Sequence, residues 1–201
     1  LLEIVATVPR LFINATKRLS SQTIQEGTVG GRTMQTVGII GLGYVGLPTA
    51  IGFHDAGFEV WGVDVSQRTV DMVMAGENPT GDPDVDDIVP APGTERWHIT
   101  TSTAEAVPHC DVVLVTVPTP ITHDLKPDLS YVEAAGRAVF EAIPKGSNTI
   151  VVLESTVYPG VTAQTWMPIV DELGLVIGED LEIAYCPCLL YTSPSPRDLL
   201  K

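Results

Sequence analysis

The sequence predicts an α/β fold, in which helices cover both faces of a doubly wound parallel sheet of about six strands. Short apolar runs typical of strands alternate with amphipathic segments typical of helices from residue 34 to residue 187. Several of these runs are almost entirely apolar, as expected for strands buried on both faces. A glycine-rich segment separates the first apolar run from the first helical segment. Together these three observations predict a parallel sheet whose strands are joined by right-handed helical crossovers.

The first half of this region predicts three strands and three helices. We expect the strands at 37–40, 59–63 and 97–99, and the helices at 47–56, 66–75 and 102–107. Gly57 is expected to end the first helix as a C-terminal cap. Ser66 is expected to cap the second helix, on which Val70 and Val73 share one face. Residues 77–96 are rich in Pro, Gly and Asp and predict a surface loop.

The second half continues the alternation with three more strands and two helices. We expect the strands at 112–117, 149–153 and 181–185, and the helices at about 130–143 and 162–173. The first of these strands is apolar apart from Thr116. Ser130 and Glu133 have the spacing of a capping box, which predicts the start of a helix. Pro168 is expected to interrupt the last helix near its first turns.

The charge of the chain is strongly negative and unevenly distributed. The 201 residues carry a formal net charge of -14, whereas residues 34–187 hold 22 acidic and five basic side chains, for -17. Nucleic acids and anionic lipid surfaces are bound by clustered Lys and Arg, so we expect neither a nucleic-acid partner nor a membrane partner. The uncharged run 37–53 is shorter than the roughly 20 residues that a membrane-spanning helix needs.

Cysteine and histidine give no sign of a disulfide framework or a metal site. Three cysteines in a chain of this length indicate a reducing compartment, and we expect a cytoplasmic protein. Cys110 and Cys186 are predicted to be small buried residues rather than nucleophiles. The four histidines are scattered without the spacing of metal ligands, so we expect packing or surface roles and no metal. They are His54, His98, His109 and His123.

Both ends of the chain differ in composition from residues 34–187. Met34 lies just before the first predicted strand, so we interpret residues 1–33 as a non-native upstream extension, with a genuine N-terminal extension as the alternative. The segment Cys188–Asp198 resembles a translated sequencing adapter, and its Ser-Pro repeats disfavour regular structure. We therefore expect residues 188–201 to be an adapter-derived tail and the chain to be an N-terminal fragment of a longer protein.

The segment 41–46 has the pattern Gly-x-Gly-x-x-Gly between a predicted strand and a predicted helix. Gly41 permits a tight turn, Gly43 lets the backbone approach a pyrophosphate, and Gly46 lets the helix pack closely on the strand. The pyrophosphate would meet the N–H groups at the helix N-terminus. Asp64 ends the second strand 18 residues after Gly46, where an acidic side chain binds the adenosine ribose and disfavours the extra phosphate of NADP. The pattern therefore predicts a Rossmann-type domain that binds NAD.

Polar side chains follow the carboxyl ends of later strands, where ligands bind in open α/β sheets. Thr119 lies between two prolines after the fourth strand and offers a hydroxyl group to a cofactor. Glu154, Ser155 and Thr156 follow the fifth strand, and Thr162 begins the next helix. Singly, such residues are more often caps and turns. Their position at one edge of the predicted sheet favours a role in cofactor binding.

Six segments in chain order extend the comparison beyond the glycine-rich loop. They are GLGYVGLP, VWGVD, VVLVTVPTP, PDLSYVEAA, ESTVYPG and IAYCP. Over about residues 36–187, this set resembles the NAD-binding domain of the UDP-glucose/UDP-N-acetylmannosamine dehydrogenase family. Two details resemble the UDP-N-acetylhexosamine branch more than the UDP-glucose branch. Glu154 opens ESTVYPG, where UDP-glucose enzymes typically have Lys, and the last strand runs into YCP.

The resemblance implies an enzyme that uses NAD to oxidise the 6-hydroxymethyl group of a UDP-sugar to a carboxylate, for polysaccharide precursor synthesis. It implies that Glu154, Ser155 and Thr156 lie near the nicotinamide. Carried over by motif, the other cofactor contacts would be Gly41, Gly43, Tyr44, Val45, Gly46, Asp64, Thr119 and Thr162. The family's catalytic Cys, Lys and Asn lie beyond the matching segments, so the resemblance implies no catalytic residue in this chain and an inactive fragment. It also implies a full-length homodimer that binds the UDP-sugar through the missing C-terminal part.

Two other functions are compatible with an NAD-binding fold. A β-hydroxyacid dehydrogenase-like enzyme also begins with Ile-Gly-Leu-Gly, but that family would be expected to have a Met-Gly pair within the loop and lacks ESTVYPG. A stand-alone NAD-binding module would require this fragment to be the natural product.

Overall fold

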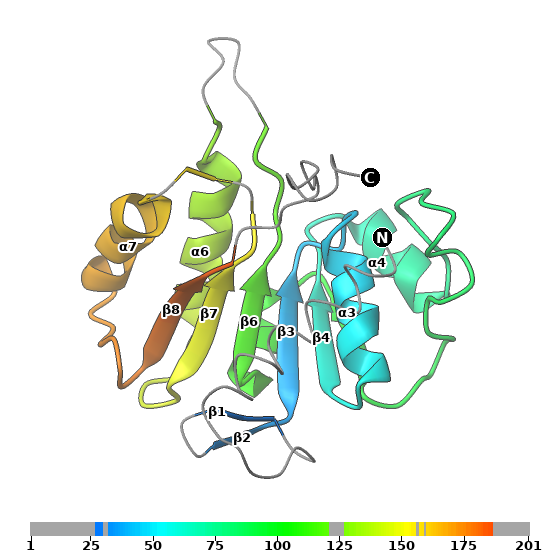
Figure 1. The fold of residues 1–201 in the computed structure, drawn as a ribbon, viewed down its shortest axis with the longest axis horizontal. Coiled ribbons are helices and arrows are strands. Elements are labelled where there is room, and N and C mark those ends of the chain that lie inside the picture. Colours follow the sequence, from blue (N-terminus) through cyan, green and yellow to red (C-terminus); the bar gives the residue numbers. More distant parts are fainter. Residues whose placement is uncertain (1–26, 30–31, 121–126, 156, 159, 187–201) are drawn as a thin grey trace, which may run out of the picture.

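The computed structural model describes residues 27–29, 32–120, 127–155, 157–158 and 160–186, and it confirms the predicted α/β fold (Figure 1). Six strands form one sheet: β3 (Thr36–Ile40), β4 (Glu59–Val63), β5 (Trp97–Thr100), β6 (Val112–Val115), β7 (Thr149–Leu153) and β8 (Leu181–Tyr185). Neighbouring strands in this sheet are all parallel, in the order β5-β4-β3-β6-β7-β8. The chain runs outward from β3 to one edge, returns to β6 beside β3 and runs outward again. This is the predicted doubly wound arrangement.

Helices connect the strands and cover parts of both faces of the sheet (Figure 1). They are α3 (Gly46–Asp55), α4 (Gln67–Met74), α5 (Thr103–Ala106), the 3₁₀ turn η1 (Val107–His109), α6 (Ser130–Ala142), the π-helical turn η2 (Thr162–Trp166) and α7 (Met167–Glu172). Apolar residues of α3 and α4 share one buried cluster, and those of α6 and α7 share the other. No helix in these described ranges is long and apolar enough to cross a lipid bilayer.

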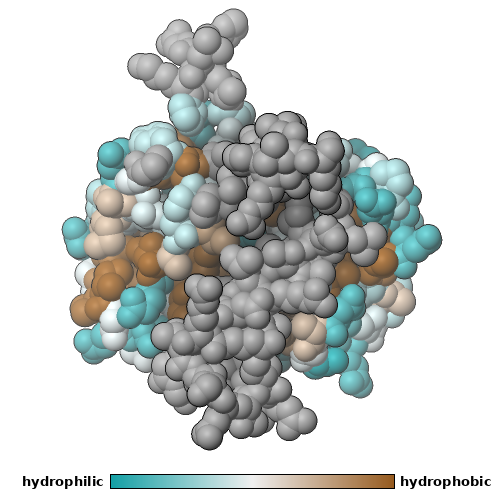
Figure 2. All heavy atoms as spheres, in the orientation of Figure 1, coloured by the Kyte–Doolittle hydropathy of each residue, from teal (hydrophilic) through white to brown (hydrophobic). Residues whose placement is uncertain are grey.

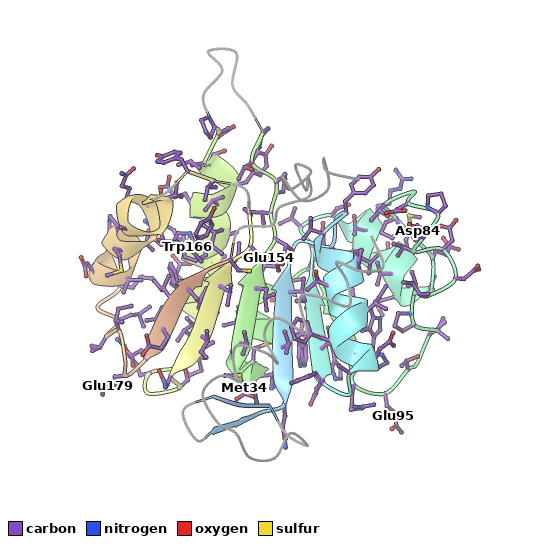
Figure 3. The ribbon with its side chains drawn as sticks, in the orientation of Figure 1. Met34, Asp84, Glu95, Glu154, Trp166 and Glu179 are labelled. Carbon is purple, nitrogen blue, oxygen red and sulfur yellow. The ribbon has the colours of Figure 1, made fainter. Side chains whose placement is uncertain are left out.

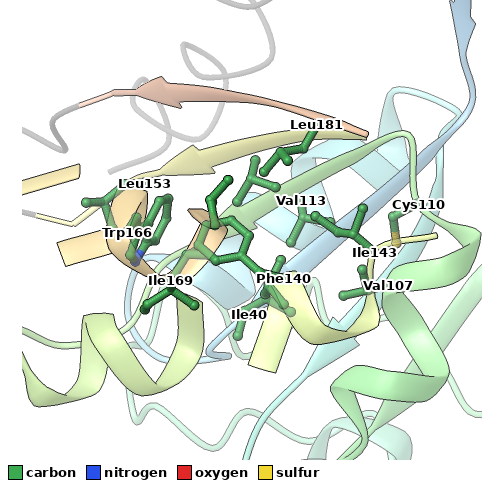
Figure 4. Packing of buried hydrophobic residues seen from close by; sticks show 14 of the residues in the cluster. Ile40, Val107, Cys110, Val113, Phe140, Ile143, Leu153, Trp166, Ile169 and Leu181 are labelled. Atoms are coloured by element: carbon green, nitrogen blue, oxygen red, sulfur yellow. The ribbon is translucent and has the colours of Figure 1, made fainter. Parts of the chain in front are cut away.

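The two buried clusters lie on opposite faces of the sheet because successive side chains of a strand point in opposite directions. In β3, Val37 and Ile39 belong to the cluster under α3, whereas Ile40 belongs to the cluster under α6 and α7. Figure 4 shows the second cluster from close by, with Phe140 and Ile169 beneath the sheet strands. Burial on both faces explains why these strands are almost entirely apolar.

Trp166 is the largest fully buried side chain and joins α6 to the following helix. Its Nε1–H donates to Val132 O at 2.9 Å, and its ring meets that of Phe140 edge to face at 5.3 Å between centroids (Figure 4). A Cβ on Gly136 would lie 2.2 Å from Trp166 Nε1. The glycine in α6 therefore makes room for the indole, which satisfies its polar atom on the backbone of the same helix.

Several predicted helix ends are confirmed. Gly57 follows α3 with φ +95°, and its N–H donates to His54 O at 2.9 Å. Ser66 is the N-cap of α4, and its Oγ accepts from the N–H of Thr69 at 3.3 Å. Pro168 stands in the first turn of α7, directly after the π-helical turn η2, so a residue without an N–H lies where the hydrogen-bond pattern of the helix changes. The last helix is therefore interrupted near its start, as the sequence predicts.

The predicted capping box at the start of α6 is wrong. Ser130 is the first residue inside the helix, and the N-cap position belongs to Leu129, which makes no side-chain cap. Instead, the Oδ1 atom of Asp128 accepts the N–H of Ser130 at 3.0 Å. An Asp side chain that binds the backbone two residues on forms a local turn, and this turn sets the helix start one residue earlier than the pattern implies.

The end of β6 also differs from the prediction, because the strand stops at Val115 rather than at residue 117. Beyond it, the carbonyl oxygen of Val117 accepts the Oγ hydroxyl of Ser155 at 2.8 Å. Pro118 and Pro120 follow, and neither has an N–H to donate to a neighbouring strand. The sheet ladder therefore ends where side-chain hydrogen bonds replace it.

A short antiparallel hairpin precedes the sheet, in a segment for which the sequence analysis predicted no strand. It pairs β1 (Gly27–Val29) with β2 (Arg32–Met34). The pair Gly30–Gly31 between these strands is a typical two-residue hairpin sequence, and this signal was missed. Met34 is buried in the cluster under α3. The non-native origin of residues 1–33 stays a prediction.

The two faces of the sheet are not covered equally by the described residues. On the α3 side, no described helix lies over β7 and β8 (Figure 1). Figure 2 shows apolar residues gathered over this part of the molecule, on the left of the view, with hydrophilic residues around the rim. On this side, the described helices therefore cover β3 and β4 more fully than β7 and β8.

Candidate functional site

The glycine-rich loop 41–46 joins β3 to α3 at the carboxyl edge of the sheet. Gly41 has φ +98°, in the left-handed region that favours glycine, and its N–H donates to Val63 O at 2.7 Å. A Cβ on Gly46 would lie 1.7 Å from Gly41 O, closer than any real contact. The tight turn and the close approach of helix to strand therefore both require glycine.

Gly43 has different surroundings. A Cβ at this position would meet no heavy atom within 4 Å, so packing within the chain does not require glycine here. α3 begins at Gly46, with Val45 as its N-cap. The exposed Tyr44 separates Gly43 from this N-cap. The first N–H groups of a helix lack intrahelical partners and carry the positive end of its dipole. An open backbone next to such an end fits the pyrophosphate of a dinucleotide.

Thr116, the residue directly after β6, supports this loop, and the sequence analysis did not include it among the site residues. Its Oγ1 lies 2.8 Å from Gly41 O and 3.0 Å from Ile40 O, so one hydroxyl proton is shared between two carbonyls of the turn. The side chain is buried. The signal available in the sequence was the single polar residue in an otherwise apolar strand.

Replacing Thr116 by Val should destabilise the domain by about 1 kcal/mol, because a methyl group takes the place of the hydroxyl and leaves the turn carbonyls with one donor fewer. The urea concentration at the unfolding midpoint measures this loss. Thr116→Ser keeps the hydroxyl and should restore most of the hydrogen-bond contribution. An unchanged midpoint in the Val variant would show that the shared hydrogen bond adds nothing to stability.

Asp64 follows β4 and fastens the glycine-rich loop to the neighbouring connection. Its Oδ2 accepts the N–H of Leu42 at 2.9 Å, and its Oδ1 accepts the N–H of Ser66 at 2.9 Å. The residue is half-buried, and each carboxylate oxygen keeps capacity for a further donor. The position beside the loop is the one from which an acidic residue binds the hydroxyls of an adenosine ribose.

Glu154 and Ser155 follow β7 and are both buried. Figure 3 places Glu154 at the edge of the sheet opposite to Met34, the last residue of β2, which shortly precedes β3. Burial raises the pKa of the Glu154 carboxyl to about 7. Ser155 donates its hydroxyl to Val117 O at 2.8 Å, so it holds the connection after β6 in place.

The remaining predicted residues are distributed over the same edge. Thr119 is half-buried in the connection after β6, and Thr162 is the first residue of η2 and also half-buried. Thr156 lies outside the described residues. Because all six strands are parallel, the glycine-rich loop, Asp64 and Glu154 come together at the carboxyl ends of β3, β4 and β7. The arrangement forms one edge that can hold an extended ligand across the sheet.

Cysteine and histidine take structural positions in the described part of the chain. Cys110 is buried and free, and burial raises the pKa of its thiol to about 12, so it is not a thiolate nucleophile. His98 and His109 both stack on Trp61, with ring centroids 4.5 and 4.8 Å away. Within the described ranges, no group of three or more His, Cys, Asp or Glu is placed to hold a metal ion. His123 lies outside those ranges.

Comparison with known proteins identifies the family. The sequence profile of the NAD binding domain of the UDP-glucose/GDP-mannose dehydrogenase family matches residues 35–201. The chain belongs to this family. NAD is therefore the cofactor of the domain, and a β-hydroxyacid dehydrogenase-like enzyme is not supported. The matched range includes residues 188–201, for which an adapter origin stays a prediction.

Curated relatives and solved structures of the family cover most of the chain. UDP-N-acetyl-D-mannosamine dehydrogenase of Escherichia coli (strain K12) is 37% identical over 159 residues, which are 76% of this chain and 37% of that protein. NDP-N-acetyl-D-galactosaminuronic acid dehydrogenase of Ralstonia nicotianae is 40% identical over 130 residues, or 65% of this chain and 30% of that protein. GDP-mannose dehydrogenase from Pseudomonas aeruginosa has a TM-score of 0.72 at 33% identity, covering 81% of this chain and 38% of that structure. The chain thus spans less than half the length of these relatives.

Proposed function

We propose that this chain is the NAD-binding half of an enzyme that oxidises the 6-hydroxymethyl group of a UDP-sugar to a carboxylate, as a step in making a polysaccharide precursor. The observation that supports the proposal most directly is the fit of the glycine-rich loop to a dinucleotide. Gly43 is open to a ligand, and Asp64 is fixed beside it by two backbone hydrogen bonds. Oxidation of a primary alcohol to a carboxylate removes two hydrides in succession, and each is accepted by an NAD molecule when it is bound.

The topology supports a placement of NAD along the carboxyl edge of the sheet. Gly41, Gly43, Tyr44, Val45 and Gly46 would hold the pyrophosphate against the N-terminus of α3. Asp64 would accept hydrogen bonds from the adenosine ribose. The nicotinamide half would then extend over the other side of the strand-order reversal, toward β6, β7 and β8. There the proposed contacts are Thr119, Glu154, Ser155, Thr156 and Thr162.

A UDP-N-acetylhexosamine is the favoured substrate class, ahead of UDP-glucose. Two kinds of relative at 37% and 40% identity bear names that refer to N-acetylated sugars. The full-length protein should reduce NAD with UDP-N-acetylmannosamine or another UDP-N-acetylhexosamine faster than with UDP-glucose, measured as NADH absorbance. If the longer protein oxidises no UDP-sugar while this chain still binds NAD, the stand-alone NAD-binding module becomes the better interpretation.

The remaining parts of the proposal concern the whole protein. We assign residues 34–187 to the NAD-binding domain, residues 1–33 to an upstream extension and residues 188–201 to an adapter-derived tail. The UDP-sugar would bind through a C-terminal part outside this chain, and the full-length protein would be a homodimer. A cytoplasmic location is supported by the free thiols of Cys110 and Cys186, which are typical of a reducing compartment.

Replacing Asp64 by Asn should weaken NAD binding by about tenfold, because the amide loses one of the two acceptor atoms that face the loop and the ribose. The same change should narrow the preference for NAD over NADP, because the negative charge that repels a ribose phosphate is gone. Calorimetric titration of both dinucleotides into the wild-type chain and the variant measures the two effects.

Asp71→Asn is the matched control for this experiment. Asp71 is exposed on α4, where it accepts a hydrogen bond from Gln67, so its replacement makes the same charge change away from the loop. Equal affinities of the Asp64 variant and this control for NAD would contradict the assigned ribose contact.

A further inference from the structure

Glu154 combines deep burial with an unsatisfied oxygen. Its side chain is 3% exposed, and its Oε2 has no hydrogen-bond partner among the described residues. The backbone is fixed, because its N–H continues the sheet ladder to Val115 O at 2.9 Å. The carboxyl group is therefore held at the carboxyl end of β7 (Figure 3), between the ends of β6 and β8. A buried polar atom without a partner in a native structure calls for an explanation.

Among the described residues, the neighbours of Glu154 supply no positive charge. On the β8 side, the titratable neighbour is Cys186, and the pKa of its thiol is raised by burial and then by the charge of Glu154. On the β6 side, the hydroxyl of Ser155 already donates to Val117 O. Burial is the cause that raises the pKa of Glu154, and no described Lys, Arg or His offsets it. An ionised carboxylate here is therefore uncompensated within the described chain.

The strand order indicates which positive charge could compensate an ionised Glu154. Asp64 on β4 and the glycine-rich loop define the adenosine and pyrophosphate positions of the proposed NAD site, so the second nucleoside extends toward β7. The nicotinamide ring carries a positive charge in NAD⁺ and none in NADH. A carboxylate in a dry site interacts far more strongly with a nearby charge than it would in water.

We propose that Glu154 discriminates between the two oxidation states of the cofactor: bound NAD⁺ holds its carboxyl ionised, whereas NADH leaves its proton equilibrium as it is in the cofactor-free site. Binding of NAD⁺ then releases to solvent the proton that the Glu154 carboxyl still carries at a given pH, and no covalent bond of the cofactor changes. This inference rests on the proposed placement of NAD. It goes beyond that placement by giving Glu154 an electrostatic role.

The test is calorimetric titration of NAD⁺ and of NADH into the 201-residue chain at pH 6, 7 and 8. The dissociation constant for NAD⁺ should fall about tenfold from pH 6 to pH 8, because the ionised fraction of a carboxyl that titrates near pH 7 rises by that factor. The constant for NADH should change by less than about twofold. Repeating the pH 7 titration in buffers of different ionisation enthalpy should show release of about half a proton with NAD⁺.

Glu154→Gln should remove both the pH dependence and the proton release while leaving binding itself measurable. Glu182→Gln is the matched control, since Glu182 is an exposed carboxylate on the neighbouring strand β8, and it should behave like the wild-type chain. If the Gln variant at position 154 does not fold, the comparison of NAD⁺ with NADH in the wild-type chain still decides the question.

The possible failures are distinguishable. Tight NAD⁺ binding that is independent of pH and releases no proton would overturn the role of Glu154 and leave the proposed function intact. An equal loss of NAD⁺ and NADH affinity in Glu154→Gln, with no pH dependence in the wild type, would show a purely structural residue. Failure of both dinucleotides to bind at millimolar concentration would instead overturn the cofactor site itself.

Discussion

Gly46→Ala is expected to destabilise the domain by about 3 kcal/mol or more, because overpacking against backbone atoms cannot be relieved by a side-chain rotation. The added Cβ would lie 1.7 Å from Gly41 O and 2.6 Å from Thr116 Oγ1. Gly41 cannot move away freely, since its N–H is bonded to Val63 O at 2.7 Å and its carbonyl accepts from Thr116 at 2.8 Å. Urea unfolding followed by circular dichroism measures the loss.

Gly43→Ala is the matched control within the same loop. Its Cβ meets no heavy atom within 4 Å, so its stability should stay within about 0.5 kcal/mol of wild type. Its affinity for NAD should nevertheless fall at least about tenfold, since the methyl group would occupy the path of the pyrophosphate. The two glycines thus separate a folding role from a binding role. Equal unfolding midpoints for both variants would contradict the packing argument for Gly46.

The glycine-rich loop shows how far sequence reasoning reached. The spacing of Gly41, Gly43 and Gly46 between a strand and a helix predicts the turn and the close packing, because both depend on local backbone geometry. Thr116 is distant in sequence, and its bond to Gly41 O exists only because β6 lies next to β3. Sequence reasoning had no means of finding this contact without the strand order.

The errors at element ends have a similar cause. Ser130 and Glu133 have the spacing of a capping box, yet the side chain of Asp128 accepts the N–H of Ser130. Spacing alone does not distinguish between such competing side-chain hydrogen bonds. Likewise, motif resemblance placed Glu154 near the cofactor. Its burial without a partner depends on the neighbouring ends of β6 and β8, which only the assembled sheet brings together.

Glu154→Gln is expected to stabilise the cofactor-free chain, and by more as the pH rises. Burial raises the pKa of Glu154 to about 7 from its usual value of 4.5, so between these values the folded state binds more protons than the unfolded state. Wild-type stability must therefore fall as the pH rises through this window, and the loss is complete above pH 7. The amide of the Gln variant does not ionise, so its stability does not fall in this way as the pH rises. The variant should be more stable than wild type by about 1 kcal/mol at pH 5 and about 3 kcal/mol at pH 8.

Urea unfolding of both proteins at pH 5 and pH 8, without NAD, measures this difference. Glu182→Gln removes an exposed carboxylate from the adjacent strand and should show no comparable dependence on pH. A stability difference between wild type and Glu154→Gln that stays constant from pH 5 to pH 8 would mean that the carboxyl ionises normally in the folded chain. If Glu154→Gln both stabilises the chain and removes the discrimination between NAD⁺ and NADH, then Glu154 serves function at a cost in folding stability. The physical reason is that a buried charge lowers stability until a cationic ligand compensates it.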